Sequence, residues 1–281
     1  MTAVAGKVCV VTGAGSGIGR ALALGLARRG ARLALSDVNE AGLQATAADA
    51  GRAGGGAVHT QVLDVSDREG MTAYAATVAS HFGVVHQIYN NAGIAHSNTI
   101  LESEYEEYER VFGINLWGVI HGTKAFLPHV IASGDGHVIN VSSLNGFLAQ
   151  PDMSHYCTTK FAVRGFTETL RSEMRRDGHR VGVTVVHPGG IKTNIASAAL
   201  NEARASGQEI TPEDEQRERL YNEKLLKMDP AQAAEIIIKA VETDRPRVMV
   251  GNDAKLVDFL VRMLPARHQT LFAAAERRMR K

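Results

Sequence analysis

The sequence is poor in cysteine: its 281 residues include only two, Cys9 and Cys157. A scaffold held together by disulfides is therefore not expected, and a reducing compartment is favoured. The N-terminus has no charged segment followed by a long apolar one, so no secretory signal is expected. No apolar stretch approaches the roughly 18 to 20 residues that a membrane-spanning helix needs. These absences predict a cytoplasmic protein.

An excess of charge of one sign is also missing, because 31 basic residues stand against 30 acidic ones and the net charge is +1. Such a balance gives no field strong enough to favour a nucleic acid as the partner, so a small-molecule ligand is expected. The length is sufficient for one large domain with a buried core, and we expect residues 1–281 to form a single domain.

The beginning of the chain has the pattern of a strand, a glycine-rich turn and a helix. Val8–Thr12 is rich in β-branched residues, residues 13–19 read Gly-Ala-Gly-Ser-Gly-Ile-Gly, and Arg20–Arg29 carries apolar residues at helical spacing. Glycines let the backbone approach a pyrophosphate, and the helix N-terminus offers unpaired N–H groups. The pattern favours a dinucleotide site, although an ordinary structural turn would also account for a glycine repeat taken alone.

The second predicted strand, Arg32–Asp37, ends in an acid about 20 residues past the glycines. A carboxylate at this place can accept hydrogen bonds from an adenosine ribose and would repel the 2′-phosphate of NADP. Neither Ser16 nor Val38 supplies a compensating cation. We therefore expect NAD in preference to NADP. The alternative is that Asp37 caps the helix that opens at Asn39.

Strand and helix patterns continue to alternate along the chain, with further strands predicted at residues 58–64, 84–89, 138–142, 181–187 and 247–250. This alternation predicts an α/β fold: a doubly wound, parallel, seven-stranded sheet with helices on both faces, the Rossmann fold. Its ligand crevice lies at the carboxyl ends of the strands.

Tyr156 and Lys160 lie four positions apart in a run with helical periodicity, so they emerge on one face of the predicted helix. A free phenol has a pKa of about 10 and is a poor acid or base at neutral pH. A neighbouring ammonium favours the phenolate and brings the group nearer to the range needed for proton transfer. The pair alone is weak support for catalysis, because this spacing arises by chance in many helices.

Taken in order, the motifs resemble those of the short-chain dehydrogenase/reductase family. The resemblance spans residues 7–195 and rests on residues 12–19, Asp64, residues 90–93, Asn115, Ser143, Tyr156 with Lys160, Pro188-Gly189 and Thr193. It implies an oxidoreductase that moves hydride between NAD(H) and a secondary alcohol or ketone, with no metal. Apolar residues near the site favour an apolar substrate skeleton: Leu144, Phe147, Leu148, Met153 and Ile195.

The resemblance also implies four catalytic roles. Tyr156 would be the acid/base, and Lys160 would lower its pKa and hydrogen-bond the nicotinamide ribose. Ser143 would hold the substrate oxygen. Asn115 would hold a water that links Lys160 to bulk solvent. The adjacent Ser142 is expected to be a strand-end residue.

The resemblance implies a further set of residues that contact the cofactor: Gly13, Ser16, Gly17, Ile18, Gly19, Asp37, Asp64, Val65, Asn91, Ala92, Gly93, Tyr156, Lys160, Pro188, Gly189, Ile191 and Thr193. No His, Cys or Asp spacing resembles a metal set, so no metal site is predicted. His155, His187 and Cys157 flank the site and are interpreted as structural.

The rest of the chain is divided by its polarity. Residues 7–195 would form the cofactor-binding and catalytic core. The polar stretch 196–228 is predicted to cover the substrate, and residues 229–281 to add a helix, a strand and an amphipathic extension. That extension could pack on its own domain, on a partner subunit or on an anionic membrane surface. The family favours a homodimer or homotetramer.

Two other functions stay open at this point. A catalytically silent dinucleotide-binding or regulatory protein could keep the fold, since fold does not dictate function. Such a protein would have no need of all four implied catalytic residues. An epimerase or dehydratase of the extended type would need a larger C-terminal domain than the residues after Ile195 supply.

Overall fold

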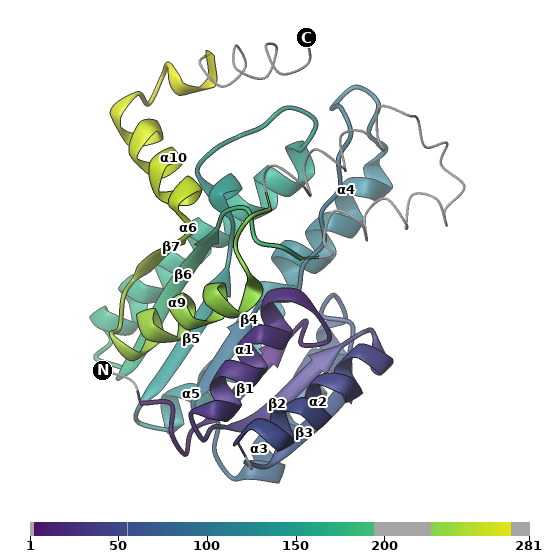
Figure 1. Ribbon diagram of the computed structural model, residues 1–281, viewed down its shortest axis with the longest axis vertical. Helices are drawn as coiled ribbons and strands as arrows, with labels where there is room; N and C mark the ends of the chain where they lie inside the picture. The colour runs from purple at the N-terminus through teal and green to yellow at the C-terminus, as the bar shows by residue number, and fades with distance from the viewer. Residues whose placement is uncertain (1–2, 55, 194–225, 271–281) are drawn as a thin grey trace.

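The computed structural model describes residues 3–54, 56–193 and 226–270. Within them, one parallel sheet has the strand order β3-β2-β1-β4-β5-β6-β7 (Figure 1). The order in which strands are added to the sheet reverses between β1 and β4, because β2 and β3 lie on one side of β1 and β4 to β7 on the other. This reversal places a crevice at the carboxyl ends of β1 and β4. The strands are β1 Val8–Thr12, β2 Arg32–Asp37, β3 Val58–Val62, β4 Gln87–Asn90, β5 Gly136–Val141, β6 Val181–Pro188 and β7 Arg247–Val250.

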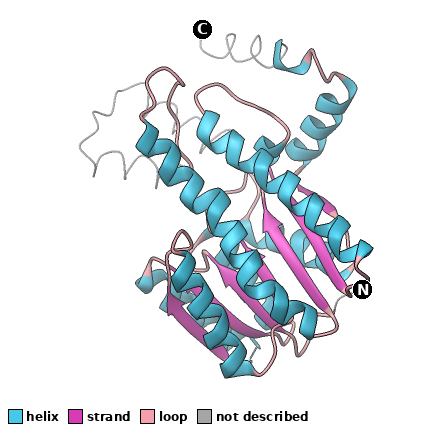
Figure 2. Ribbon diagram, turned by 180° about the vertical axis from the view of Figure 1, so that it is seen from behind, coloured by secondary structure: helices cyan, strands magenta, loops and turns pink. Residues whose placement is uncertain are grey.

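Helices cover both faces of this sheet, as Figure 1 and the reverse view in Figure 2 show. Buried residues of α1, α2 and α9 pack on one face, and those of α3, α5 and α6 on the other. The predicted doubly wound Rossmann fold is therefore confirmed. The α-helices are α1 Gly17–Arg28, α2 Glu40–Gly54, α3 Arg68–Phe82, α4 Tyr105–Phe112, α5 Gly118–Ala132, α6 Ser154–Arg176, α9 Pro230–Glu242 and α10 Asn252–Met263.

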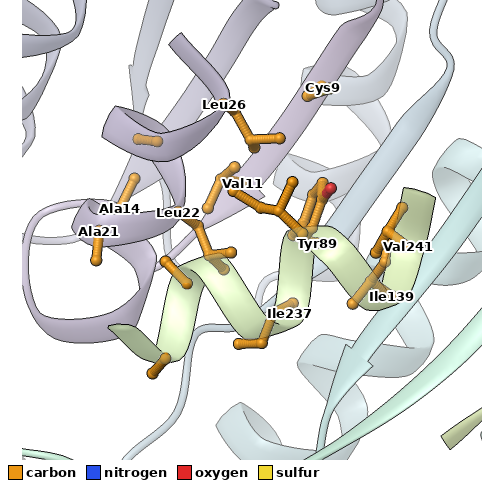
Figure 3. Packing of buried hydrophobic residues seen from close by; sticks show 14 of the residues in the cluster. Cys9, Val11, Ala14, Ala21, Leu22, Leu26, Tyr89, Ile139, Ile237 and Val241 are labelled. Carbon is orange, nitrogen blue, oxygen red and sulfur yellow. The ribbon is translucent and has the colours of Figure 1, made fainter. Parts of the chain in front are cut away.

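The core on the first face joins the two ends of the described chain. Val11 of β1, Leu22 of α1 and Ile237 of α9 are fully buried and belong to one cluster (Figure 3). Burial of each such side chain contributes about 1.5–3 kcal/mol. The segment after residue 225 is thus packed into the same layer as the glycine turn, which lies at the start of α1.

A chain of buried polar side chains crosses the other side of the sheet. Asn90 of β4 donates to Asn140 of β5 at 2.8 Å, and Asn140 donates to Thr167 of α6 at 3.0 Å. Asn90 also donates to Thr123 of α5 at 3.1 Å. At most 2 % of any of these residues is exposed. Because their polar atoms cannot reach water, the hydrogen bonds fix α5 and α6 against the strands.

Three local features shape the segments between these elements. Helices α4 and α5 are joined by a π-helical segment, Gly113–Trp117. Asp229 is the N-cap of α9, and its side chain accepts from the backbone of Ala231 at 2.7 Å. After Pro188 the chain forms one further bridge, between Ile191 and Met228.

The described helices include none that is both long and apolar enough to cross a membrane. Beyond β7, α10 extends away from the sheet layers (Figure 1). Three of its apolar side chains are more than half exposed: Leu256, Phe259 and Met263. The predicted cover at 196–228 lies outside the described residues up to residue 225.

Candidate active site

The glycine turn between β1 and α1 is folded so tightly that side chains would not fit. Gly13 and Gly17 have φ angles of +66° and +52°, which favour glycine. A Cβ added to Gly19 would lie 1.9 Å from the carbonyl oxygen of Gly13. Ser16 is the N-cap of α1 but makes no side-chain cap, and Ile18 packs partly buried against the core. The turn therefore presents backbone at a helix N-terminus, as a bound pyrophosphate requires.

Thr12 and Asn91 hold this turn against the loop after β4. The Thr12 hydroxyl accepts from the backbone N–H groups of Asn91 and Ala92 at 3.0 and 3.1 Å. The Asn91 amide donates to the carbonyl oxygens of Thr12 and Gly13. The side chain of Asn91 thus shapes the groove. Sequence reasoning did not give Thr12 a role, because its partners lie far along the chain.

Asp37 lies at the end of β2 beside the glycine turn. Its carboxylate accepts from the backbone N–H groups of Gly15 and Asn39, both at 2.8 Å. The helix cap itself is Asn39, whose side chain accepts from Gly42 at 3.2 Å. Asp37 therefore links the glycine turn to the start of α2, and its neighbour Val38 is 65 % exposed. This place fits the carboxylate that accepts from an adenosine ribose.

Asp64 and Val65 lie in the turn after β3. The Asp64 carboxylate accepts from the backbone and hydroxyl of Ser66 at 2.8 and 2.7 Å. Val65 is buried, and a Cβ added at Gly118 would lie 2.6 Å from its side chain. The carboxylate therefore has a structural use within its own turn.

Tyr156 and Lys160 lie in the first turns of α6, and the Lys160 Nζ is 5.5 Å from the centre of the Tyr156 ring. Tyr156 is half-buried, whereas only 4 % of Lys160 is exposed. The ammonium donates to the carbonyl oxygen of Val141, at the end of β5, at 3.2 Å. Burial lowers the pKa of Lys160 to about 8. At neutral pH the site therefore still holds a positive charge beside the phenol.

Ser143 follows β5 and is held by two neighbours. Its hydroxyl accepts from the backbone N–H of Asn145 at 3.1 Å, and its carbonyl accepts from Nδ1 of His187 at 2.7 Å. Burial lowers the pKa of His187 to about 3, so the ring stays neutral. The hydroxyl of Ser142 instead donates to the Lys160 carbonyl at 2.7 Å, which agrees with the structural role expected for it.

Asn115 lies in the π-helical segment, a feature often found at functional sites. Its amide forms two hydrogen bonds of 2.8 Å with the backbone of Ile94. A Cβ at Gly93 would lie 3.0 Å from Asn115 Oδ1 and 3.5 Å from Lys160 Nζ. Gly93 therefore lies between the amide and the ammonium, and the loop after β4 is fixed along this line.

The loop after β6 carries the remaining predicted contacts. Gly189 donates to Val250 at 2.9 Å, and Gly190 donates to the Asp253 carboxylate of α10 at 2.6 Å. Thr193 lies beside the glycine turn, since a Cβ at Gly17 would be 3.1 Å from its methyl group. The loop after β6 thus lies next to the glycine turn. Pro188 ends β6, and Ile191 is buried.

Three residues that sequence reasoning left out of any metal set come together beside α6. Ligand atoms of His96, Glu107 and His155 lie within 4.8 Å of one another. No sequence spacing could have revealed this group, because its members belong to a loop and to two different helices. Two other residues flank the site. Cys157 is buried and forms no disulfide, and the ring centre of His187 lies 5.1 Å from that of Phe147.

Comparison with known proteins places these features in a family. The model of the short chain dehydrogenase family matches residues 7–204. A putative oxidoreductase SadH of Mycobacterium tuberculosis is 50% identical over 275 residues, 98% of this chain and 96% of that protein. Estradiol 17-beta-dehydrogenase 11 of Homo sapiens is 34% identical over 212 residues, 75% of this chain and 69% of that protein.

Solved structures agree with this match. A short chain dehydrogenase/reductase from Burkholderia phymatum in complex with NAD has a TM-score of 0.84 and 32% identity, over 98% of this chain and 97% of that one. Levodione reductase has a TM-score of 0.76 and 28% identity, over 89% and 98% of the two chains. The glycine turn and the groove fit the NAD(P) that this family uses. The chain is thus an oxidoreductase of the short-chain dehydrogenase/reductase family.

Proposed function

We propose that the protein transfers hydride between NAD(H) and a secondary alcohol or ketone with an apolar skeleton. The observation that carries this proposal is the buried Lys160 ammonium 5.5 Å from the Tyr156 ring, at the end of the sheet where the glycine turn also lies. A buried positive charge beside a half-buried phenol is costly for the fold, and it suits a group that must exchange a proton.

The proposed chemistry divides the work among four side chains. When bound, the nicotinamide ring supplies or accepts the hydride. Tyr156 gives or takes the proton at its phenol oxygen, and the charge of Lys160 favours the phenolate. The Ser143 hydroxyl donates to the substrate oxygen and stabilises charge there. Asn115 holds a water that connects Lys160 with solvent.

The same proposal includes a preference for NAD over NADP. The Asp37 carboxylate is fixed by two backbone N–H groups, so it cannot easily turn away from a 2′-phosphate. The next residue is the exposed and uncharged Val38. Repulsion without a compensating cation disfavours NADP. The NAD named in the Burkholderia phymatum complex supports this choice.

The substrate class is supported by two relatives whose names specify alcohols on apolar skeletons. One is the estradiol dehydrogenase above, and the other is epidermal retinol dehydrogenase 2 of Homo sapiens, 38% identical over 195 residues, 68% of this chain and 62% of that protein. Of the residues expected in an apolar pocket wall, Leu144 and Met153 are partly exposed, whereas Phe147 and Leu148 are buried. Ile195 lies outside the described residues.

The decisive experiment compares Tyr156→Phe with the parent on a panel of secondary alcohols and ketones, following NADH absorbance. We expect turnover to fall by about 10²- to 10⁴-fold, because the transferable proton is lost, while NAD affinity in a fluorescence titration stays unchanged. Tyr105→Phe, at a tyrosine that is 84 % exposed, is the matched control. Equal turnover in Tyr156→Phe would remove the assignment. A parent that binds NAD but turns over no compound would favour the silent dinucleotide-binding protein.

We further propose a homodimer or homotetramer in the cytoplasm. The exposed Leu256, Phe259 and Met263 on α10 support an apolar contact between subunits, and two buried, unpaired cysteines suit a reducing compartment. Deleting residues 256–281 should lower the mass in sedimentation velocity and leave NAD affinity unchanged. An unchanged mass would mean that α10 packs on its own subunit. Binding of the parent to anionic vesicles would instead favour a contact between α10 and a membrane surface.

A further inference from the structure

The cluster of His96, Glu107 and His155 combines residues that no step of the proposed reaction uses. His96 lies in the loop after β4, Glu107 in the first turn of α4 and His155 in the first turn of α6. Their ligand atoms lie within 4.8 Å of one another. We propose that these three side chains bind a divalent transition-metal ion of the zinc type, which would join the loop to both helices.

The spacing of the donor atoms suits such an ion. Bonds of 2.0–2.1 Å in a tetrahedral site separate neighbouring ligand atoms by about 3.3 Å. His96 Nε2 and Glu107 Oε1 are 2.8 Å apart, and the outer limit for the group is 4.8 Å. Small side-chain movements would bring all three to the required distance. Two imidazoles and one carboxylate, with a fourth position for water, form a known type of zinc site.

The carboxylate of Glu107 is already oriented by its surroundings. Its Oε2 accepts from the Glu104 backbone at 3.0 Å and from the Asn98 amide at 3.4 Å. These bonds leave Oε1 directed at His96. Partners of this kind hold metal ligands in place.

The ring of His155 provides the second observation. None of its surface is exposed, and its Nδ1 has no hydrogen-bond partner among the described residues. Its Nε2 meets the Ser103 hydroxyl only at 3.4 Å. A buried ring with one unpartnered nitrogen costs stability unless something binds there.

A simpler interpretation of the cluster needs no metal ion: His96 and Glu107 form a hydrogen bond, and the ring of His155 packs against neighbouring rings. The ring of His155 does lie 4.8 Å from that of His96 and 5.0 Å from that of Tyr108. Packing accounts for the burial of His155 but not for its unpartnered nitrogen. A cation would take the place of the proton that His96 and Glu107 share, and would use His155 as well.

The position of the cluster indicates what the ion would do. The loop already pairs with the residues before α6, because Asn98 donates its backbone N–H to Asp152 at 2.7 Å. His155 directly precedes Tyr156 on α6. An ion here would fix the loop next to the proposed acid/base without touching it. The site is independent of the proposed hydride transfer and could be present in a protein with no turnover.

The test is calorimetric titration of Zn²⁺ into untagged, chelator-treated protein without cofactor, with unfolding midpoints measured in parallel. We expect one tight site per chain and a higher midpoint with Zn²⁺. His96→Ala and Glu107→Gln should each weaken binding by about 100-fold or more, since even losing a partner around the ligands costs 10- to 100-fold. Gln keeps the helix cap at position 107, so the second variant should fold normally.

Matched controls are His179→Ala and Glu106→Gln, which remove an exposed histidine and an exposed glutamate outside the cluster. Both should bind Zn²⁺ like the parent. The proposal is overturned if the parent binds no more tightly than His96→Ala and Glu107→Gln, or if the controls weaken binding equally. Titration with Mg²⁺, which prefers oxygen ligands, should give no comparable site, and equal binding would contradict the imidazole ligands.

Discussion

Replacing Lys160 with methionine should make the cofactor-free protein more stable at neutral pH while removing its proposed activity. Methionine keeps an unbranched side chain of similar shape. It removes the positive charge of a residue that is only 4 % exposed. The lost hydrogen bond to the Val141 carbonyl shifts stability by an amount that changes little with pH. The dependence of the stability difference on pH therefore isolates the buried charge.

The magnitude follows from the pKa of Lys160, which burial lowers from 10.5 to about 8. One pH unit in a pKa corresponds to about 1.4 kcal/mol, so the buried ammonium destabilises the fold by roughly 3 kcal/mol at neutral pH. Below about pH 8 both the folded and the unfolded chain hold this proton, and the destabilisation is constant. Between about pH 8 and 10.5 only the unfolded chain holds it, so the stability contributed by this group rises with pH.

The assay is urea unfolding of the parent and Lys160→Met at several pH values from about 7 to about 10.5, the range in which the folded and unfolded pKa values lie. The advantage of the variant should shrink by roughly 3 kcal/mol across this range. Lys124→Met, at an exposed lysine of α5, should show no such trend. A stability difference for Lys160→Met that does not change with pH would refute the reasoning.

Three further results are expected. Asp37→Ser combined with Val38→Arg should move the preference in steady-state kinetics from NAD toward NADP, and a parent that already prefers NADP would contradict this. Gly19→Ala should sharply weaken NAD in a fluorescence titration, because its methyl group would meet a backbone oxygen at 1.9 Å, whereas Gly51→Ala, where nothing lies within 4 Å, should not. Asp253→Ala should raise the KM for the cofactor more than Asp253→Asn, because asparagine keeps an oxygen that can accept from the backbone of Gly190. Equal KM values for the two variants would show that this hydrogen bond has no role in cofactor binding.

Local patterns in the sequence were sufficient to predict the layers of the fold. The boundaries of Arg32–Asp37 and Arg247–Val250 match β2 and β7 because short apolar runs between turn residues have few alternatives. The π-helical segment at Asn115 could not be predicted. Its Asn115 side chain accepts from the backbone N–H of Ile94 and donates to the Ile94 carbonyl, and this partner is distant in sequence.

In the candidate site too, local contacts could be predicted from the sequence and tertiary contacts could not. The helical spacing of Tyr156 and Lys160 predicted their proximity, since it depends on one helix alone. The support behind Ser143 from His187, and the contact of Asp253 with the loop after β6, are tertiary. Each joins segments separated by more than forty positions, so no local pattern carries them. The same limit hid the cluster around His155.

The buried chain from Thr123 through Asn90 and Asn140 to Thr167 has a consequence for how this sequence can evolve. Replacing one member with an apolar residue leaves its neighbours with unpaired polar atoms, which costs about 1–3 kcal/mol for each. Replacing both partners together can be nearly neutral. Evolution at these positions is therefore expected to proceed by compensated pairs, and the helix that carries Tyr156 keeps its register for as long as the pairs hold.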